Sequence, residues 1–268
     1  MERLAKKKIT SFSMDAIPRI ARAQTMDALS SMSTIIGYKA VLTGANLSGR
    51  YLPLMMTAGA TIPAGKVLIL GVGVAGLQAI ATARRLGAIV EAFDIRPAVK
   101  EQVKSLGATF IEVGEIAQET EDKGGYAKEV TEETRRREEE VIHKHIKDAD
   151  IVITTALVPG KAAPILVTEE MVKSMKPGAV IVDLAAETGG NCKLTEPGRD
   201  VMKHRVIISG PLNVASSMPM EASQLYSQNI STLLLLLVKD GKLSLDFKDA
   251  VVSGCCITYQ GEIRNAQG

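Results

Sequence analysis

The feature that most restricts the fold is an alternation of short apolar runs with helix-like segments, which begins after residue 65. The apolar runs are Lys66–Leu70 (KVLIL), Ile89–Phe93, 109–113, Ile151–Thr154, 179–182 and 206–208. The helical segments expected between them include 75–86, 97–106 and 132–147, and the last mixes both signs of charge as a solvated helix face does. Strands that alternate with helices form a parallel sheet covered on both faces. The pattern therefore predicts an α/β fold with a doubly wound parallel sheet.

The segments on either side of this region have a different character. Residues 9–14 form a short β-like run, and a proline-free stretch from about 21 to 47 is typical of a long helix. Another helix is expected at about 219–239, and short β-like pieces follow it. A chain of 268 residues is long for one domain and comfortable for two.

Composition argues against several classes of function. A net charge of +2, 3% aromatic residues and the absence of tryptophan give neither the basic field nor the stacking surfaces of a nucleic-acid-binding protein. No run reaches the ~20 apolar residues that a membrane span needs, so no direct membrane insertion is expected. Cys192, Cys255 and Cys256 form a poor disulfide framework, which favours a reducing compartment. His143 and His145 point to different faces of a helical segment, so no metal site is expected.

A glycine-rich loop follows the first apolar run. It consists of Gly71, Val72, Gly73, Val74, Ala75 and Gly76 (GVGVAG), which fits G-x-G-x-x-G directly after a strand and at the start of a helix. In this position Gly71 permits the tight turn, Gly73 lets the backbone approach a pyrophosphate, and Gly76 lets helix and strand pack closely. The helix N-terminus faces the anion. The loop predicts a dinucleotide-binding unit of Rossmann type, and a glycine turn without a ligand is the alternative.

A carboxylate stands at the end of the next apolar run. Asp94 lies 23 residues after Gly71, where a carboxylate accepts hydrogen bonds from both ribose hydroxyls of an adenosine and repels a 2′-phosphate. This position predicts NAD(H) rather than NADP(H). Arg96, two residues further on, softens the preference without reversing it, and Ile95 between them is counted with the site.

Further stretches make the chain resemble a known family. They are 23–31 (AQTMDALSS), 124–128 (GGYAK), 155–161 (TALVPGK), 182–192 (VDLAAETGGNC) and 224–230 (QLYSQNI). Over nearly its whole length the chain is similar to the NAD(H)-binding alpha subunit, domain I, of proton-translocating NAD(P) transhydrogenase, and more distantly to alanine dehydrogenase. The resemblance implies an enzyme that passes a hydride from NADH bound here to NADP⁺ on a partner domain. A membrane-embedded component would couple this exchange to proton translocation.

The resemblance also assigns catalytic roles to the N-terminal motif. Asp27 and Ser30 are expected to hold the nicotinamide carboxamide, and Arg19 is expected near the ring. Gln24 would reach toward the partner's nucleotide. For Arg22, packing or a salt bridge is expected instead of ligand contact.

Two loops complete the expected nucleotide site. Gly124 and Tyr126 match a mobile loop of the family that folds over the bound nucleotide, with an ordinary turn tyrosine as the alternative. The second loop begins where a strand ends at the carboxyl edge of the sheet, which is where ligands bind in such folds. It contributes Thr154, Thr155, Ala156 and Leu157.

The chain departs from the family at its start. The family's first domain begins well before the residue that is Met1 here, so 1–30 and 215–268 are expected to form an incomplete, discontinuous α/β domain beside a Rossmann domain at 31–214. A fragment, a separately encoded N-terminal segment and a naturally short gene stay open. A partial layer exposes apolar surface, which predicts a homodimer or poor solubility. The expected location is cytoplasmic, peripheral on the inner face of a bacterial inner membrane, or on the matrix side in mitochondria.

Two other functions stay open. An amino-acid dehydrogenase of the alanine dehydrogenase type needs a catalytic histidine and lysine from an N-terminal domain, and an aspartate where this chain has Glu187. A sensor or scaffold protein would keep NAD(H) binding without turnover.

Overall fold

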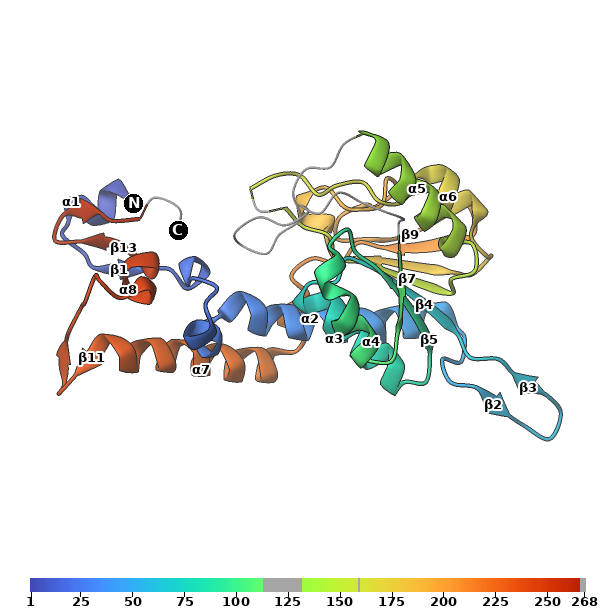
Figure 1. Ribbon diagram of the computed structural model, residues 1–268, viewed down its shortest axis with the longest axis horizontal. Coiled ribbons are helices and arrows are strands. Elements are labelled where there is room, and N and C mark those ends of the chain that lie inside the picture. Colours follow the sequence, from blue (N-terminus) through green and yellow to red (C-terminus); the bar gives the residue numbers. More distant parts are fainter. Residues whose placement is uncertain (113–131, 159, 266–268) are drawn as a thin grey trace. The chain divides into compact units, whose positions relative to one another are not determined.

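The computed structural model describes residues 1–112, 132–158 and 160–265 (Figure 1). The chain divides into two compact units. Unit 1 combines Met1–Ser33 with Ala215–Gly268, and unit 2 is Thr34–Val214. These bounds differ by three residues from the division at residue 30 that the sequence suggested.

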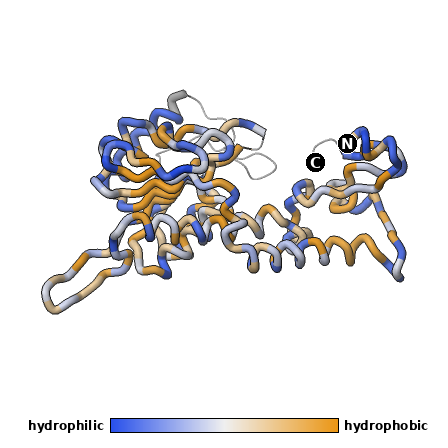
Figure 2. The backbone as a smooth tube through the Cα atoms, turned by 180° about the vertical axis from the view of Figure 1, so that it is seen from behind, coloured by the Kyte–Doolittle hydropathy of each residue, from blue (hydrophilic) through white to orange (hydrophobic). Residues whose placement is uncertain are grey.

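Unit 2 contains a seven-stranded sheet with the strand order β6-β5-β4-β7-β8-β10-β9. Neighbouring strands pair in parallel, except that β9 runs antiparallel to β10 at the edge. All the expected apolar runs lie in this sheet, and its central strands are coloured hydrophobic in Figure 2. The strands are β4 (Lys66–Leu70), β5 (Ile89–Phe93), β6 (Thr109–Ile111), β7 (Ile151–Thr154), β8 (Val180–Asp183), β9 (Asp200–Lys203) and β10 (Val206–Ser209).

Helices cover both faces of this sheet. Successive side chains of a strand point to opposite faces, so a strand that is apolar throughout needs a core on each side. Val67 and Ile69 enter one core, together with side chains of α2, α3 and α4. Leu68 and Leu70 enter the other core, with side chains of α5 and α6. The predicted doubly wound α/β class is therefore confirmed. The helices are α2 (Ala28–Ser48), α3 (Val74–Arg85), α4 (Lys100–Ser105), preceded by the 3₁₀ helix η3 (Pro97–Val99), α5 (Glu132–Ile146) and α6 (Glu169–Ser174).

Unit 1 joins the two ends of the chain in one small core. Ile17, Ala23 and Met26 pack there with Leu233 and Val251 from the C-terminal segment. A three-stranded antiparallel sheet completes the unit, in the order β1-β13-β14. The elements are α1 (Glu2–Lys6), β1 (Ser11–Phe12), η1 (Met14–Ala16), α7 (Pro219–Leu237), β11 (Val238–Lys239), β12 (Lys242–Leu243), α8 (Ala250–Cys255), β13 (Cys256–Tyr259) and β14 (Glu262–Ile263).

The expected helix over 21–47 is interrupted near its start. A 3₁₀ helix, η2 (Ala21–Met26), comes first, and α2 begins only at Ala28. The break lies at Asp27, whose backbone is extended (φ −76°, ψ 91°). The Asp27 carboxylate accepts a hydrogen bond from the Ser30 backbone N–H at 2.9 Å, so it caps the first turn of α2. The sequence also did not reveal the hairpin of β2 (Met55–Met56) and β3 (Thr61–Ile62) or the antiparallel edge strand β9.

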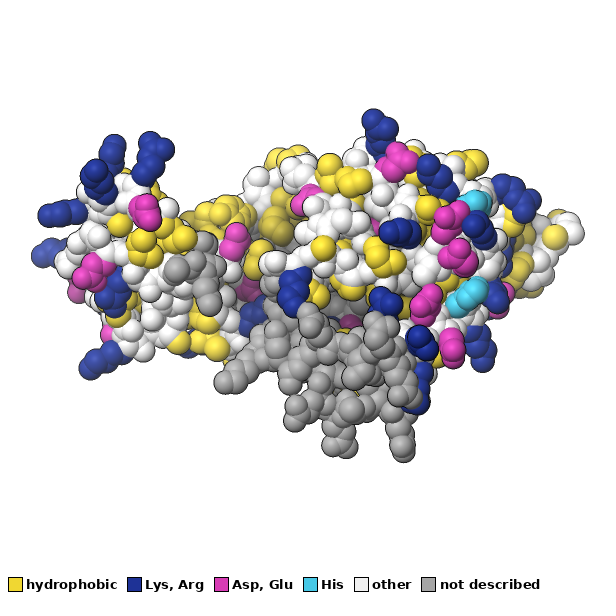
Figure 3. All heavy atoms as spheres, turned by 90° about the horizontal axis from the view of Figure 1, so that it is seen from above, with side chains coloured by type: hydrophobic (Ala, Val, Ile, Leu, Met, Phe, Trp, Pro, Cys, Tyr) yellow, Lys and Arg dark blue, Asp and Glu magenta, His cyan; other side chains and the backbone are white. Residues whose placement is uncertain are grey.

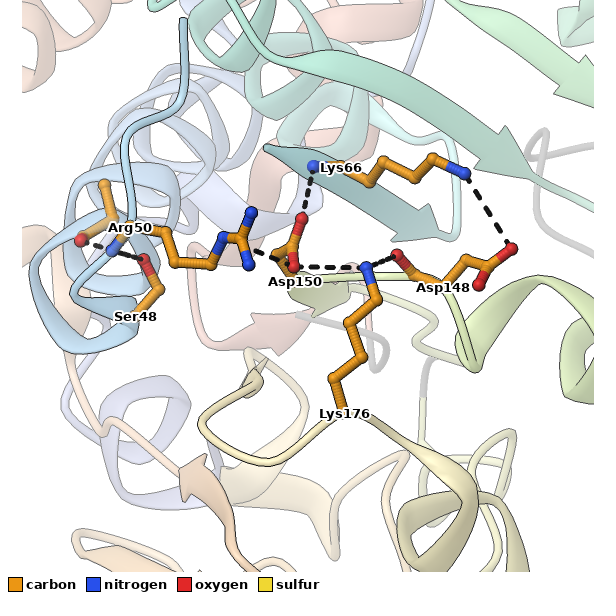
Figure 4. Close-up of polar contacts among 7 residues, drawn as sticks. Ser48, Arg50, Lys66, Asp148, Asp150 and Lys176 are labelled. Atoms are coloured by element: carbon orange, nitrogen blue, oxygen red, sulfur yellow. Dashed lines mark hydrogen bonds and ion pairs between the residues drawn. The ribbon is translucent and has the colours of Figure 1, made fainter. Parts of the chain in front are cut away.

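A buried carboxylate anchors the amino ends of β4 and β7 (Figure 4). Asp150, just before β7, accepts a hydrogen bond from the Lys66 backbone N–H at 2.8 Å. Its other oxygen pairs with Lys176 Nζ at 3.2 Å and Arg50 Nε at 3.5 Å, while its side chain is only 4% exposed. The cluster lies at the sheet edge opposite to the carboxyl ends, so we interpret it as a support of the fold.

Charged side chains of both signs are interspersed on the face of unit 2 seen in Figure 3. This distribution agrees with the mixed charge pattern of α5. Of the helices in the described ranges, none has the length and the hydropathy that crossing a membrane requires. The three cysteines are buried, unpaired thiols.

Candidate dinucleotide site

The loops after β4 and β7 meet at the point where the winding of the sheet reverses. From β4 the chain proceeds to β5 and β6 on one side, and it then returns to β7 on the other side of β4. In doubly wound sheets the ligand crevice lies outside the carboxyl ends of the strands at this switch point. Here the Thr155 backbone N–H donates to the Leu70 carbonyl at 2.8 Å, and the Thr155 hydroxyl donates to the Gly71 carbonyl at 2.9 Å. These bonds join the two loops that would form the crevice.

The three glycines of the loop differ in what surrounds them. Gly71 has φ +98°, and a Cβ there would lie 2.7 Å from the Thr155 hydroxyl. A Cβ on Gly76 would lie 2.1 Å from the Gly71 carbonyl oxygen, so strand and helix leave no room for a side chain. A Cβ on Gly73 would meet no atom within 4 Å. The fold therefore requires glycine at 71 and 76, whereas Gly73 leaves open space at the N-terminus of α3, as an approaching pyrophosphate would need.

Asp94 lies directly beside this loop, and its carboxylate accepts four hydrogen bonds. Oδ2 accepts from the Val72 backbone N–H at 2.7 Å and from Arg96 Nη2 at 2.8 Å. Oδ1 accepts from the Arg96 backbone N–H at 2.9 Å and from Arg96 Nε at 2.8 Å. The side chain of Asp94 is 7% exposed and that of Arg96 is 14% exposed. The two residues thus form a bidentate ion pair next to the glycine loop.

The loop after β7 is supported by two residues for which no role was expected. Asn191 accepts a hydrogen bond from the Ala156 backbone N–H at 3.0 Å and donates to the Ala156 carbonyl at 2.9 Å. Asp183, the last residue of β8, is fully buried and accepts from the Thr154 hydroxyl at 2.9 Å. Thr154 is itself fully buried, whereas Leu157 is 48% exposed. Both supporting residues belong to the 182–192 stretch, and Asp183 ends an apolar run as Asp94 does, which is the signal that could have found it.

A second carboxyl group lies near Asp94. Glu138 on α5 is 5% exposed, and its Oε1 has no hydrogen-bond partner in the described ranges of the chain. Burial, followed by the nearby negative charge of Asp94, raises the pKa of Glu138 to about 7. Two carboxyl groups therefore lie close to one another near the end of β5.

The N-terminal motif is ordered by contacts within unit 1. The Ser30 hydroxyl donates to Asp27 Oδ2 at 2.6 Å, which adds to the helix cap. Asn229 on α7 donates from Nδ2 to the Thr25 carbonyl at 2.8 Å, and it thereby holds η2 in place. Gln24 is exposed on η2, and Arg19 is exposed just before it. The structure therefore brings Asp27 and Ser30 together.

Other residues singled out in the sequence have these places in the structure. Arg22 pairs with Asp249, so the expected salt bridge is confirmed. Glu187 is exposed, and its Oε1 accepts a hydrogen bond from the Asn213 backbone N–H at 2.6 Å. Gly124 and Tyr126 lie outside the described residues. Ile95 is half-buried between Asp94 and Arg96.

Comparisons with known proteins identify the family. The sequence matches the family described as alanine dehydrogenase/PNT, C-terminal domain, over residues 40–266. It is 54% identical to a protein of Rhodospirillum rubrum that is named as the first portion of NAD(P) transhydrogenase subunit alpha, over 98% of this chain and 69% of that protein. The structure resembles the crystal structure of transhydrogenase from Sinorhizobium meliloti with a TM-score of 0.84 and 46% identity, covering 98% of this chain and 70% of that one.

The chain is more distantly similar to the alanine dehydrogenases of the same family. An L-alanine dehydrogenase structure has a TM-score of 0.73 and 26% identity, with 99% of this chain and 69% of that chain covered. The shared fold is thus common to both enzymes, while the sequence is much closer to the transhydrogenases. The chain belongs to the alanine dehydrogenase/PNT family, and within it to the relatives of the NAD(P) transhydrogenase alpha subunit.

Proposed function

We propose that the chain is the NAD(H)-binding component of a proton-translocating NAD(P) transhydrogenase. The observation that carries the proposal is the junction at the switch point. There the glycine loop, locked to Thr155, stands beside Asp94 at the end of the neighbouring strand. This junction offers a helix N-terminus for a pyrophosphate and a carboxylate for a ribose diol. The 54% identity to a transhydrogenase subunit supports the choice of reaction.

Each group of residues has a defined task in this proposal. The first turn of α3 binds the pyrophosphate through backbone N–H groups, and the open side of Gly73 admits it. Asp94 and Ile95 bind the adenosine ribose, and residues 155–157 line the opposite wall. Asp27 and Ser30 hold the nicotinamide carboxamide, with Arg19 near the ring and Gln24 directed to the partner's nucleotide.

The chemistry requires little of the protein beyond positioning. Bound NADH supplies the hydride, which is accepted by NADP⁺ on a partner component to give NAD⁺ and NADPH. The residues named above orient the ring and exclude water, and none of them has to act as a general acid or base. The partners in this proposal are an NADP(H)-binding component and a membrane-embedded component that couples the exchange to proton translocation. This chain would lie peripherally on the inner face of that membrane, as a homodimer.

The binding step of the proposal is tested by titrating the chain with NADH and NADPH side by side, with calorimetry as the readout. We expect a clear preference for NADH. Asp94→Asn should weaken NADH binding by about tenfold, because the amide accepts fewer hydrogen bonds from the ribose hydroxyls. Equal affinity for the two nucleotides would refute the assignment of Asp94.

The reaction is tested by mixing the chain with an NADP(H)-binding transhydrogenase component. Hydride transfer from NADH to NADP⁺, or from NADPH to an NAD⁺ analogue with a distinct absorbance, supports the proposal. Nucleotide binding without exchange would instead support a sensor or scaffold. Sustained NADH production from alanine and NAD⁺ would support an amino-acid dehydrogenase. Two observations argue against that reaction. This chain has Glu187 where such an enzyme needs an aspartate, and it is 26% identical to the L-alanine dehydrogenase.

A further inference from the structure

Hydrogen bonds within the chain fill all the acceptor positions of the Asp94 carboxylate. A carboxylate offers about four lone-pair positions, and Asp94 uses four, two on each oxygen. A ribose diol needs two of these positions. Nucleotide binding at Asp94, which is the function proposed above, therefore requires that two existing hydrogen bonds break first.

Two of the four donors are held by the backbone. The N–H groups of Val72 and Arg96 belong to the glycine loop and to the turn after β5, and Val72 is 1% exposed. The other two donors, Nε and Nη2, belong to the guanidinium of Arg96, which a side-chain rotation can remove together. Nη2 also donates to the Val72 carbonyl at 3.2 Å, so the same group closes over the glycine loop.

We propose that the Arg96 guanidinium occupies the ribose-diol position of Asp94 and competes with the nucleotide for it. This inference rests on the proposed NAD(H) site and adds a specificity-determining residue to it. When the guanidinium leaves Asp94, it stays close to the ribose 2′ position, because Arg96 is only two residues from Asp94. A 2′-phosphate then meets a positive charge beside the negative one, so Arg96 reduces the discrimination against NADPH.

The proposal is tested with Arg96→Met, which keeps the aliphatic stem and removes the guanidinium. Only a fraction of wild-type molecules has Asp94 available, and the variant removes this restriction. We therefore expect NADH and AMP to bind on the order of tenfold more tightly. NADPH affinity should rise less or fall, so the ratio of NADH to NADPH affinity increases. Nicotinamide mononucleotide, which lacks the adenosine ribose, should bind as it does to the wild type.

A conservative variant separates occupancy from charge. Arg96→Lys keeps the positive charge but cannot bond both carboxylate oxygens through a planar fork. It should therefore bind AMP with an affinity between those of the wild type and Arg96→Met, and it protects the test against misfolding of the methionine variant. A merely structural arginine would lower the unfolding temperature without tightening AMP binding.

These measurements distinguish failure of the competition by Arg96 from failure of the proposed NAD(H) site. If NADH binds to the wild type but its affinity is unchanged or weaker in both variants, the competition by Arg96 is refuted while the proposed site stands. If neither the wild type nor the variants bind NADH or AMP, the proposed function fails, and this inference fails with it.

Discussion

Asp27 has a structural task that is independent of any ligand. Its carboxylate binds the backbone N–H and the hydroxyl of Ser30, which caps α2. An aspartate in the proposed nicotinamide loop therefore serves the fold as well, and a simple alanine variant would confuse the two tasks.

Paired variants resolve these tasks. Asp27→Ala should lower the free energy of unfolding by about 1 kcal/mol, because the cap is lost, and it should weaken NADH binding as well. Asp27→Asn retains a cap of similar strength, so its stability should stay within about 0.5 kcal/mol of the wild type. Urea denaturation and NADH titration measure both quantities. If Asp27→Asn binds NADH normally and supports hydride transfer at the wild-type rate, the charge of Asp27 has no role in the reaction.

Glu138 should make the stability of the chain dependent on pH. Its pKa is raised to about 7 from an ordinary value of 4.5, so the folded state prefers the protonated form. The stability that this preference provides is fully present below the ordinary pKa and is lost as the pH rises through about 7.

The variant Glu138→Gln removes this titration. We expect it to be about 1–2 kcal/mol more stable than the wild type at about pH 8, and nearly equal to it at about pH 4.5. Chemical denaturation at both pH values measures the difference. Glu139→Gln, at an exposed neighbouring position, is the control and should show little effect. A constant difference across the pH range would mean that folding leaves the pKa of Glu138 unchanged.

At the scale of elements, the glycine loop separates what the fold needs from what a ligand needs. Gly76→Ala places a Cβ 2.1 Å from a backbone oxygen, so the strand and helix must move apart. Gly73 has an extended conformation (φ −80°, ψ −166°) that alanine adopts readily, and its Cβ would face open space.

These environments predict opposite phenotypes. Gly76→Ala should lower the free energy of unfolding by about 3 kcal/mol. Gly73→Ala should change stability by less than about 1 kcal/mol and weaken NADH binding at least about tenfold, because the new methyl group lies where the pyrophosphate is proposed to bind. Thermal unfolding and calorimetric titration provide the readouts. Normal NADH affinity in Gly73→Ala would place the pyrophosphate elsewhere.

The Asp150 cluster belongs to the same scale, because it connects strands and not single side chains. Asp150→Ala leaves the Lys66 N–H without its acceptor and removes the carboxylate that pairs with Lys176 and Arg50, while Lys176 keeps its hydrogen bond to the Asp148 carbonyl. Stability should therefore fall by about 3 kcal/mol, while the NADH affinity of the folded protein is retained. Asp148→Ala is the matched control, since that side chain is 71% exposed. Equal unfolding midpoints for the two variants would contradict a supporting role for Asp150.

At the scale of the whole molecule, exposed apolar side chains favour association. On α7, Tyr226, Ile230 and Leu234 follow one another at steps of four residues and are 42%, 41% and 55% exposed. We expect a homodimer in sedimentation velocity at micromolar concentration, which Ile230→Glu converts to monomer. Met202→Glu, at a 69% exposed position in unit 2, should leave the dimer intact. A dimer that survives Ile230→Glu would have its interface elsewhere.

Much of unit 2 could be predicted from local patterns. β4, β5 and β7 have the expected bounds, because a buried parallel strand requires a continuous apolar run, whichever strands lie beside it. The glycine loop and Asp94 were identifiable for a similar reason, since a tight turn and a strand-end carboxylate follow from residues adjacent in sequence.

The tertiary structure decided which side chains complete the site. Asn191 supports Ala156 across 35 residues, Thr155 locks onto Gly71 across 84, and Asn229 holds Thr25 across 204. Such contacts depend on the order of the strands and on the closure of the chain ends, which no local periodicity encodes. Even for Asp94 and Arg96, which are two residues apart, only the tertiary structure shows that the guanidinium binds both carboxylate oxygens. The sequence by itself determined that a carboxylate, Asp94, stands beside the glycine loop. Only the fold decided that all the acceptor positions of this carboxylate are filled, because the glycine loop directs the N–H of Val72 toward it and the turn after β5 directs the guanidinium of Arg96 toward it.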